Sequence, residues 1–124
     1  MEMFSVLLVD DEEEFVKTLA ERLRMRNIAS EVALSGEQAL HLLGDYTPDV
    51  MVVDLKMPGM DGLEVLRVVK STYPQVQVII LTGHGSDRDE ETARRIGACE
   101  YLQKPISIDE LLDALHRAFQ GKCY

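Results

Sequence analysis

The chain has 124 residues, of which 46% are hydrophobic, and both figures fit one globular domain. Thirteen lysines and arginines against 22 aspartates and glutamates give a net charge of −9, which argues against direct binding of DNA or RNA, because nucleic-acid binders normally carry a basic face. No apolar stretch approaches the roughly 18 residues needed to cross a bilayer, and the first residues lack a signal-peptide pattern. Cys99 and Cys123 have neither a metal-site spacing nor a disulfide framework, which favours a reducing, cytoplasmic location.

Short apolar runs alternate with helical segments along the whole chain. Strands are predicted at residues 5–9, 29–34, 49–53, 76–81 and 99–102. Three of these runs are almost continuously apolar, as is typical of strands that are covered on both faces. The second run contains Ser30 and Glu31, so we expect it at an edge of the sheet.

Amphipathic helices are predicted between the strands. They cover residues 13–25, 36–43, 63–72 and about 87–96, and a last helix follows Ser107. Ser107 is its predicted N-cap, with Glu110 completing a capping box, and Asp61 is the predicted cap of the third helix. The fourth helix is nearly all charged and buries little surface, so we expect it to be the loosest element.

Five strand–helix repeats predict an α/β fold with a parallel sheet that helices cover on both faces. Ligands of such folds bind beyond the carboxyl ends of the strands, so the residues that directly follow each strand are the candidate site. These residues are Asp10, Asp11, Asp54, Thr82 and Lys104.

Acidic residues are frequent at these strand ends. Residues 12–14 are all glutamates that open a helix, and we attribute them to the positive end of the helix dipole. Asp10 and Asp11, in contrast, would face Asp54 across neighbouring strands, where clustered carboxylates need a compensating cation to stay ionised. Oxygen ligands favour a hard ion, so the sequence predicts a Mg²⁺ site.

Four pieces of sequence occur in a specific order, each after a predicted strand. They are VDD at 9–11, PDVMVVDLKMPGMDG at 48–62, LTG at 81–83 and GACEYLQKP at 97–105. Together they resemble the receiver domain of bacterial two-component response regulators, of the chemotaxis-regulator type. The resemblance runs from about residue 4 to residue 119. It implies one receiver domain over residues 1–124, with a (βα)5 doubly wound, five-stranded parallel sheet in the flavodoxin-like order 2-1-3-4-5.

This resemblance also implies roles for the strand-end residues. Asp54 would be the phosphoacceptor, attacking the phosphohistidine of a histidine kinase or a phosphotransfer protein. Asp11 would bind Mg²⁺ directly and Asp10 mainly through a water, while Asp54 and the backbone carbonyl of Lys56 would complete the protein ligands. Lys104 would pair with Asp54 before phosphorylation and with a phosphoryl oxygen afterwards.

Four further expectations concern the residues around the acceptor. The Thr82 hydroxyl would turn toward the phosphoryl group, and Tyr101 matches the aromatic residue that then swings inward; a strand tyrosine that only packs is the alternative. Lys56 and His84 would flank the path of water to the phosphoaspartate and tune its lifetime, although His84 also fits a solvated loop position. The Lys104–Pro105 peptide bond is expected to be cis.

The leading hypothesis is therefore a phosphorylation-driven signalling switch that catalyses only its own phosphorylation and dephosphorylation. It would regulate an effector protein or domain through its fourth helix, fifth strand and fifth helix. Pairing of two activated receivers there is one explanation of the mixed charges on this face, and solvated helix surfaces are the alternative. It would act in the cytoplasm, without contact to a membrane. Whether the chain acts alone or within a longer activator or hybrid kinase stays open.

Two other classes of function are weighed against this switch. A receiver-like module that works by contact alone usually lacks the acceptor, the lysine or one acidic residue, and this chain keeps all of them. An aspartyl phosphatase would need a second aspartate two residues after the acceptor, where this chain has Lys56.

Overall fold

The computed structural model describes residues 4–123, in which five strands alternate with five helices. The strands are β1 (Ser5–Val9), β2 (Ala29–Ala33), β3 (Val50–Val53), β4 (Gln77–Thr82) and β5 (Glu100–Gln103). The helices are α1 (Glu13–Arg24), α2 (Gly36–Leu43), α3 (Gly62–Thr72), α4 (Asp87–Ile96) and α5 (Ile108–Phe119). All neighbouring strands are parallel and the sheet order is β2-β1-β3-β4-β5, which confirms the predicted topology and the edge position of the second strand.

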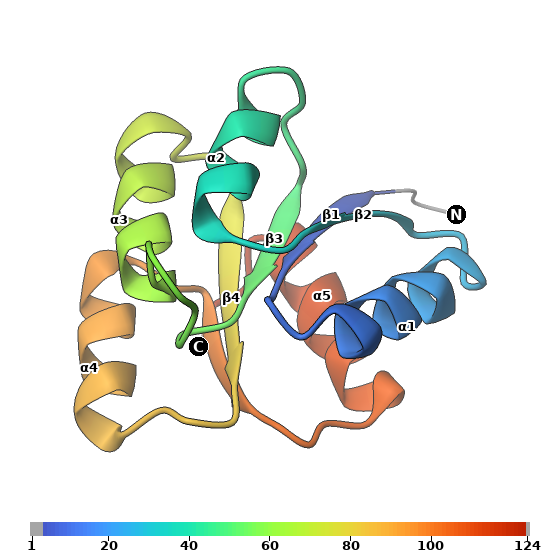
Figure 1. Cartoon of the computed structure of the whole chain (residues 1–124). Coiled ribbons are helices and arrows are strands. Elements are labelled where there is room, and N and C mark those ends of the chain that lie inside the picture. Colours follow the sequence, from blue (N-terminus) through green and yellow to red (C-terminus); the bar gives the residue numbers. More distant parts are fainter. Residues whose placement is uncertain (1–3, 124) are drawn as a thin grey trace.

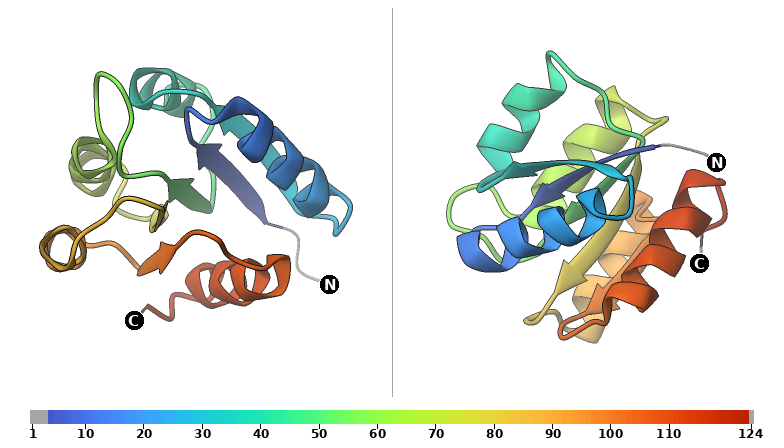
Figure 2. Two further views of the ribbon diagram at one scale, coloured as in Figure 1. Left: turned by 60° about the horizontal axis from the view of Figure 1, so that its bottom comes forward. Right: turned by 90° about the vertical axis from the view of Figure 1, so that its right-hand side faces the viewer.

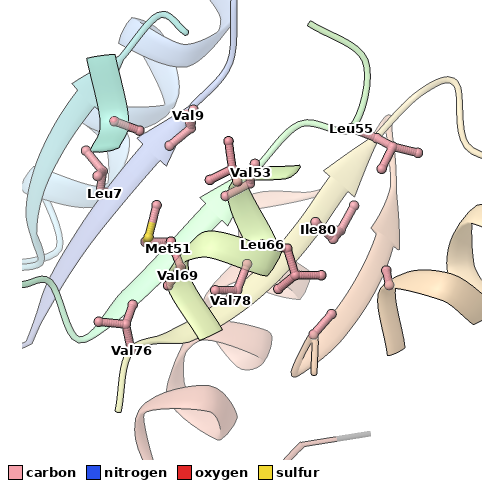
Figure 3. Packing of buried hydrophobic residues seen from close by; sticks show 14 of the residues in the cluster. Leu7, Val9, Met51, Val53, Leu55, Leu66, Val69, Val76, Val78 and Ile80 are labelled. Atoms are coloured by element: carbon pink, nitrogen blue, oxygen red, sulfur yellow. The ribbon is translucent and has the colours of Figure 1, made fainter. Parts of the chain in front are cut away.

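Helices cover both faces of the sheet. Figure 1 shows α1 and α5 on one face and α2, α3 and α4 on the other, and Figure 2 shows these layers from two further sides. Successive residues of a strand point to opposite faces, so Leu7 and Val9 belong to the core under α2, α3 and α4, whereas Val6 and Leu8 belong to the core under α1 and α5. The first of these cores is drawn in Figure 3. Apolar residues at successive positions of β1 and β3 therefore fill both layers.

Side-chain caps fix where most helices begin. Asp61 accepts a hydrogen bond from the N–H of Glu64, and Ser107 accepts one from the N–H of Glu110, which confirms both predicted N-caps. A fully reciprocal capping box forms at the start of α4, between Ser86 and Asp89. Across residues 4–123, no helix is long and apolar enough to span a membrane.

The two cysteines form a disulfide, contrary to the expectation of a reduced pair without a disulfide framework. Cys99 lies directly before β5 and is 1% exposed, and its Cα atom is 4.5 Å from that of Cys123 in the C-terminal tail. The two residues are 24 positions apart, and no periodic pattern in the sequence relates them. Their meeting depends on the turn that follows α5.

A Schellman turn ends α5 and reverses the chain. The N–H of Lys122 donates to the carbonyl of Arg117, and the N–H of Gly121 donates to that of Ala118. Gly121 has a φ of 77°, a left-handed conformation in which glycine is favoured because a Cβ atom would be strained. The tail after this turn therefore runs back to Cys99.

Cys123→Ser is expected to lower the free energy of unfolding by about 3 kcal/mol and the melting midpoint by roughly 10 °C, because the unfolded chain regains the freedom of a closed loop. Cys123 is the better position to change, since serine at the buried Cys99 would add an unsatisfied hydroxyl. Urea unfolding with and without dithiothreitol measures the effect: the reductant should destabilise the unmodified chain and leave the variant unchanged. Equal midpoints for the oxidised and reduced chains would contradict this expectation.

Candidate functional site

Four polar side chains gather at the carboxyl ends of β1, β3, β4 and β5. Asp10 follows β1, Asp54 follows β3, Thr82 is the last residue of β4 and Lys104 follows β5. Asp10 and Asp54 are each 4% exposed and Thr82 is 0% exposed. The carboxyl ends of parallel strands lie at the same edge of a sheet, which is why residues so far apart in sequence meet here.

Asp54 is held by backbone contacts on both sides. Its N–H donates to the carbonyl of Val9 at 2.9 Å, and its Oδ1 accepts from the N–H of Leu55 at 2.8 Å. Gly62, the first residue of α3, packs directly against the backbone of Asp54. A Cβ atom at position 62 would lie 2.2 Å from the Asp54 carbonyl oxygen, so this close approach requires glycine. Oδ2 of Asp54 is the oxygen on the side of Lys104, at 3.9 Å from Nζ.

Lys104 is bound mainly by the residues that lead into α1. Its Nζ lies 2.8 Å from Oδ2 of Asp10 and 2.7 Å from Oε1 of Glu12, and 4.5 Å from the centre of the Phe15 ring. The expected pair with Asp54 is thus present as the longest of three ion pairs. The Lys104–Pro105 peptide bond is cis, as the resemblance implied.

The electrostatics of this cluster follow from burial and from Lys104. Burial raises the pKa of Asp10 above its usual value, and the hydrogen bond from Lys104 opposes this only in part. Burial would lower the pKa of Lys104, but its bonds to Asp10 and Glu12 outweigh that effect and raise it overall. The bond to Lys104 lowers the pKa of Glu12. Lys104 therefore stays charged and compensates its carboxylate neighbours.

Asp10, Glu12 and Asp54 form an acidic group that fits a divalent metal ion. One oxygen of each lies within 4.8 Å of one oxygen of the other two, and oxygen ligands of this kind suit Mg²⁺ or Ca²⁺. Asp11, the expected direct ligand, is exposed and is not part of this group. Its role as a metal ligand stays a prediction.

Sequence reasoning missed Glu12, which it assigned to the helix dipole. Glu12 is the N-cap residue of α1, but its side chain makes no capping hydrogen bond and reaches Lys104 instead. Glu12 directly follows two aspartates and lies one residue before α1. This position could have identified it, because a side chain at the start of a helix can turn toward the ends of the neighbouring strands.

The residues after β4 and within β5 lie close to one another. Oγ1 of Thr82 accepts from the N–H of His84 at 3.2 Å, while the side chain of His84 is exposed. Tyr101 is 7% exposed, and its buried hydroxyl has no hydrogen-bond partner among residues 4–123. The ring is thus inside the protein, in the core under α3 and α4.

Lys56 lies at the surface, two residues after Asp54. Its Nζ is 3.7 Å from Oδ2 of Asp89, a residue in the first turn of α4. The Lys56 side chain is 55% exposed and that of Asp89 is 22% exposed, so the pair contributes little to stability, but it links the loop after β3 to the start of α4.

Comparison with known proteins adds independent evidence. The family model of the response regulator receiver domain matches residues 6–116. The chain is 37% identical over 120 residues to an NtrX-like response regulator of Rickettsia bellii, which covers 95% of this chain and 25% of that protein. The chain spans about a quarter of the length of the curated relatives it matches.

Solved structures agree with this match. A response regulator receiver domain protein from Clostridium thermocellum superposes with a TM-score of 0.90 at 32% identity, covering 96% of each chain. A response regulator protein from Burkholderia pseudomallei, solved with a phosphorylated aspartic acid, a calcium ion and citrate, superposes with a TM-score of 0.86 at 31% identity, covering 95% of this chain and 70% of that one.

Proposed function

The chain belongs to the response regulator receiver domain family, and from this premise we propose that it is a phosphoacceptor switch of a two-component phosphorelay, with Asp54 as the acceptor. The observation that carries the proposal is the position of Asp54, a buried carboxylate at the end of β3 with one oxygen directed toward Lys104. The phosphorylated aspartic acid of the Burkholderia relative supports the same chemistry here.

The proposed reaction transfers a phosphoryl group from a phosphohistidine. Oδ2 of Asp54 forms a bond to phosphorus while the bond from phosphorus to the imidazole nitrogen breaks, and the electron pair leaves with the imidazole. The attacking carboxylate must be ionised and in line with that nitrogen. The Leu55 N–H holds Oδ1, which orients Oδ2 for attack, and the Lys104 ammonium then pairs with a phosphoryl oxygen.

Carboxylates of this site would hold Mg²⁺. Asp54, Asp11 and the backbone carbonyl of Lys56 are the proposed direct ligands, with Asp10 acting through a water. The acidic group of Asp10, Glu12 and Asp54 supports a metal at this place, and Asp11 becomes a ligand only by turning inward from its exposed position. When bound, the ion offsets the negative charge of the carboxylates and of the phosphoryl oxygens.

Asp11→Ala is expected to weaken Mg²⁺ binding by about tenfold or more, because the site loses an anionic ligand. Amide NMR shifts of Asp10 and Leu55 during a Mg²⁺ titration measure the affinity. Glu13→Ala is the matched control: it removes an equal charge from the exposed first turn of α1 and should change the affinity little. Unchanged binding by Asp11→Ala, with a loss in Glu12→Gln, would make Glu12 the ligand instead.

Signal transmission is proposed to start at Thr82. Its hydroxyl would turn from the His84 N–H to a phosphoryl oxygen. This movement would open space beside Thr82, and the Tyr101 ring would fill that space. The face of α4, β5 and α5 would then bind an effector protein or domain, or a second activated receiver. Lys56 and His84 would tune the lifetime of the phosphoaspartate, Lys56 by leaving Asp89 to cover the phosphoryl group.

The proposed phosphodonor partner is a histidine kinase or a histidine phosphotransfer protein in the cytoplasm. A net charge of −9 supports action through protein contact rather than by direct binding of nucleic acid. Disulfides are rare in a reducing cytoplasm, so we expect the Cys99–Cys123 pair to be reduced there.

Incubation with acetyl phosphate and Mg²⁺, followed by mass spectrometry of the intact chain and of its peptides, tests the proposal. Stoichiometric phosphorylation at Asp54 is the expected result. No labelling would indicate a module that acts by contact alone, and repeated turnover of added phosphoesters would indicate a phosphatase. Either of these outcomes would overturn the switch.

A further inference from the structure

The Tyr101 hydroxyl occupies a space that exists only because residue 85 has no side chain. A Cβ atom on Gly85 would lie 1.6 Å from the Tyr101 hydroxyl oxygen, 2.8 Å from Cζ of the same ring and 3.0 Å from Cγ2 of Thr82. Atoms do not approach so closely, so a side chain at position 85 and the present position of Tyr101 exclude each other.

Backbone conformation does not explain this glycine. Gly59, Gly97 and Gly121 have positive φ angles, whereas the φ of Gly85 is outside the left-handed region. Gly83 lies in the same loop between β4 and α4, yet a Cβ atom there would have its nearest contact at 3.8 Å, an ordinary van der Waals distance. The demand for glycine in this loop is therefore steric and specific to position 85.

We propose that Gly85 is a positioning residue that sets whether Tyr101 can lie inside the protein. This inference rests on the switching role proposed for Tyr101 and adds the residue on which its inward position depends. The Tyr101 hydroxyl is buried without a hydrogen-bond partner among the described residues, so no polar contact there favours the inward ring. The available space, and hence residue 85, decides its position.

The loop that carries Gly85 connects Thr82 with α4. His84, directly before it, donates its N–H to the Thr82 hydroxyl, and Ser86, directly after it, is the N-cap of α4. Burial, together with the charges of Asp89, Glu90 and Asp87, raises the pKa of Tyr101, in keeping with a hydroxyl that faces the first turn of α4. If Thr82 releases the His84 N–H, the loop can shift at Gly85 and change the space left for Tyr101.

Gly85→Ala tests this role, with Gly83→Ala as the matched control. Tetranitromethane modifies accessible tyrosines, and peptide mass spectrometry reports the nitration rate of Tyr101 separately. We expect Tyr101 to be nitrated at least about tenfold faster in Gly85→Ala, because the ring turns outward, and at an unchanged rate in Gly83→Ala. Equal rates in Gly85→Ala and the unmodified chain would overturn the proposal.

A double-mutant cycle covers the case in which Gly85→Ala folds poorly. Leucine at position 101 lacks the ring atoms that a Cβ atom at position 85 would meet. Gly85→Ala should therefore lower the melting midpoint in the unmodified chain and lower it much less in a Tyr101→Leu background, where only the 3.0 Å approach to Cγ2 of Thr82 remains. An equal loss in both backgrounds would overturn the proposal.

Labelling of Asp54 by acetyl phosphate separates this inference from the proposed function. The three atoms nearest to a Cβ atom at position 85 belong to Tyr101 and Thr82 rather than to Asp54 or Lys104, so Gly85→Ala keeps the acceptor and should still be labelled stoichiometrically, even if the contact with Thr82 changes the rate. Absence of labelling in the unmodified chain would contradict the proposed function, while the nitration rates and the double-mutant cycle would still decide the role of Gly85.

Discussion

Asp54→Asn is expected to abolish labelling by acetyl phosphate while leaving the fold intact. The amide has no anionic oxygen to attack phosphorus, but it has the size and shape of the carboxylate, and its oxygen can still accept from the Leu55 N–H. The change also removes one of three clustered carboxylates, so the repulsion among them falls and stability should not decrease. Intact mass with and without acetyl phosphate, and urea unfolding, measure the two effects.

Asp61→Asn is the control for this variant. It removes the same charge at the N-cap of α3, outside the group of Asp10, Glu12 and Asp54, and asparagine caps a helix as well as aspartate does. Full labelling of Asp61→Asn together with none of Asp54→Asn assigns the acceptor. Stoichiometric labelling that persists in Asp54→Asn would mean that another side chain accepts the phosphoryl group.

Hydrophobic patterning predicted the elements of the fold, but it marks burial rather than hydrogen bonding. The apolar pattern predicts Val76 in the fourth strand, and Val76 is fully buried, yet its N–H donates to the Tyr73 carbonyl in the turn before β4. The same pattern ends the strand before the polar Thr82, yet Thr82 belongs to β4 because it pairs with Gln103 of β5. The ends of strands are set by pairing with neighbours, which periodicity does not report.

The sequence predicts those residues of the candidate site whose positions follow from the strand order alone. Asp10, Asp54 and Lys104 meet because parallel strands bring their carboxyl ends to one edge. The bond from Lys104 to Glu12 depends instead on side-chain conformations across two loops. The Cys99–Cys123 disulfide likewise depends on a turn after α5 that is fixed by hydrogen bonds rather than by an apolar pattern.

Lys104→Met is expected to lower the free energy of unfolding at pH 7 by on the order of 3 kcal/mol, because it leaves buried carboxylates without their cation. The Lys104 side chain is 15% exposed, and it contacts Asp10 and Asp54, whose side chains are 6% and 4% exposed. Methionine keeps most of the apolar stem of lysine, so the decrease in the free energy of unfolding measures mainly the loss of the positive charge. Lys17→Met is the control, since Lys17 forms a solvated pair with Glu13 on α1 and should change stability by less than about 0.5 kcal/mol.

The destabilisation by Lys104→Met should depend on pH in a direction set by Asp10. The pKa of Asp10 is already raised by burial, and loss of the Lys104 hydrogen bond removes an effect that lowers it, so the pKa rises further. At pH values between the pKa of Asp10 in the unfolded chain and its higher pKa in the folded protein, the native state binds more protons than the unfolded chain. The free energy of unfolding therefore falls as pH increases through this range. The loss should be largest at pH 7 and smaller near pH 4, where protonation removes the uncompensated charge.

Urea unfolding of Lys104→Met and of the unmodified chain between pH 4 and pH 7 measures this dependence. Parallel stability curves would contradict charge compensation and would mean that Lys104 acts through packing of its stem. Divergence of the two stability curves toward neutral pH would show that the Lys104 ammonium favours the ionised form of the buried Asp10 carboxylate. An ionised, buried carboxylate beside a cation is also what an attack by Asp54 on phosphorus requires, so the stability of the resting site and the proposed reactivity of the acceptor depend on the same ion pairs.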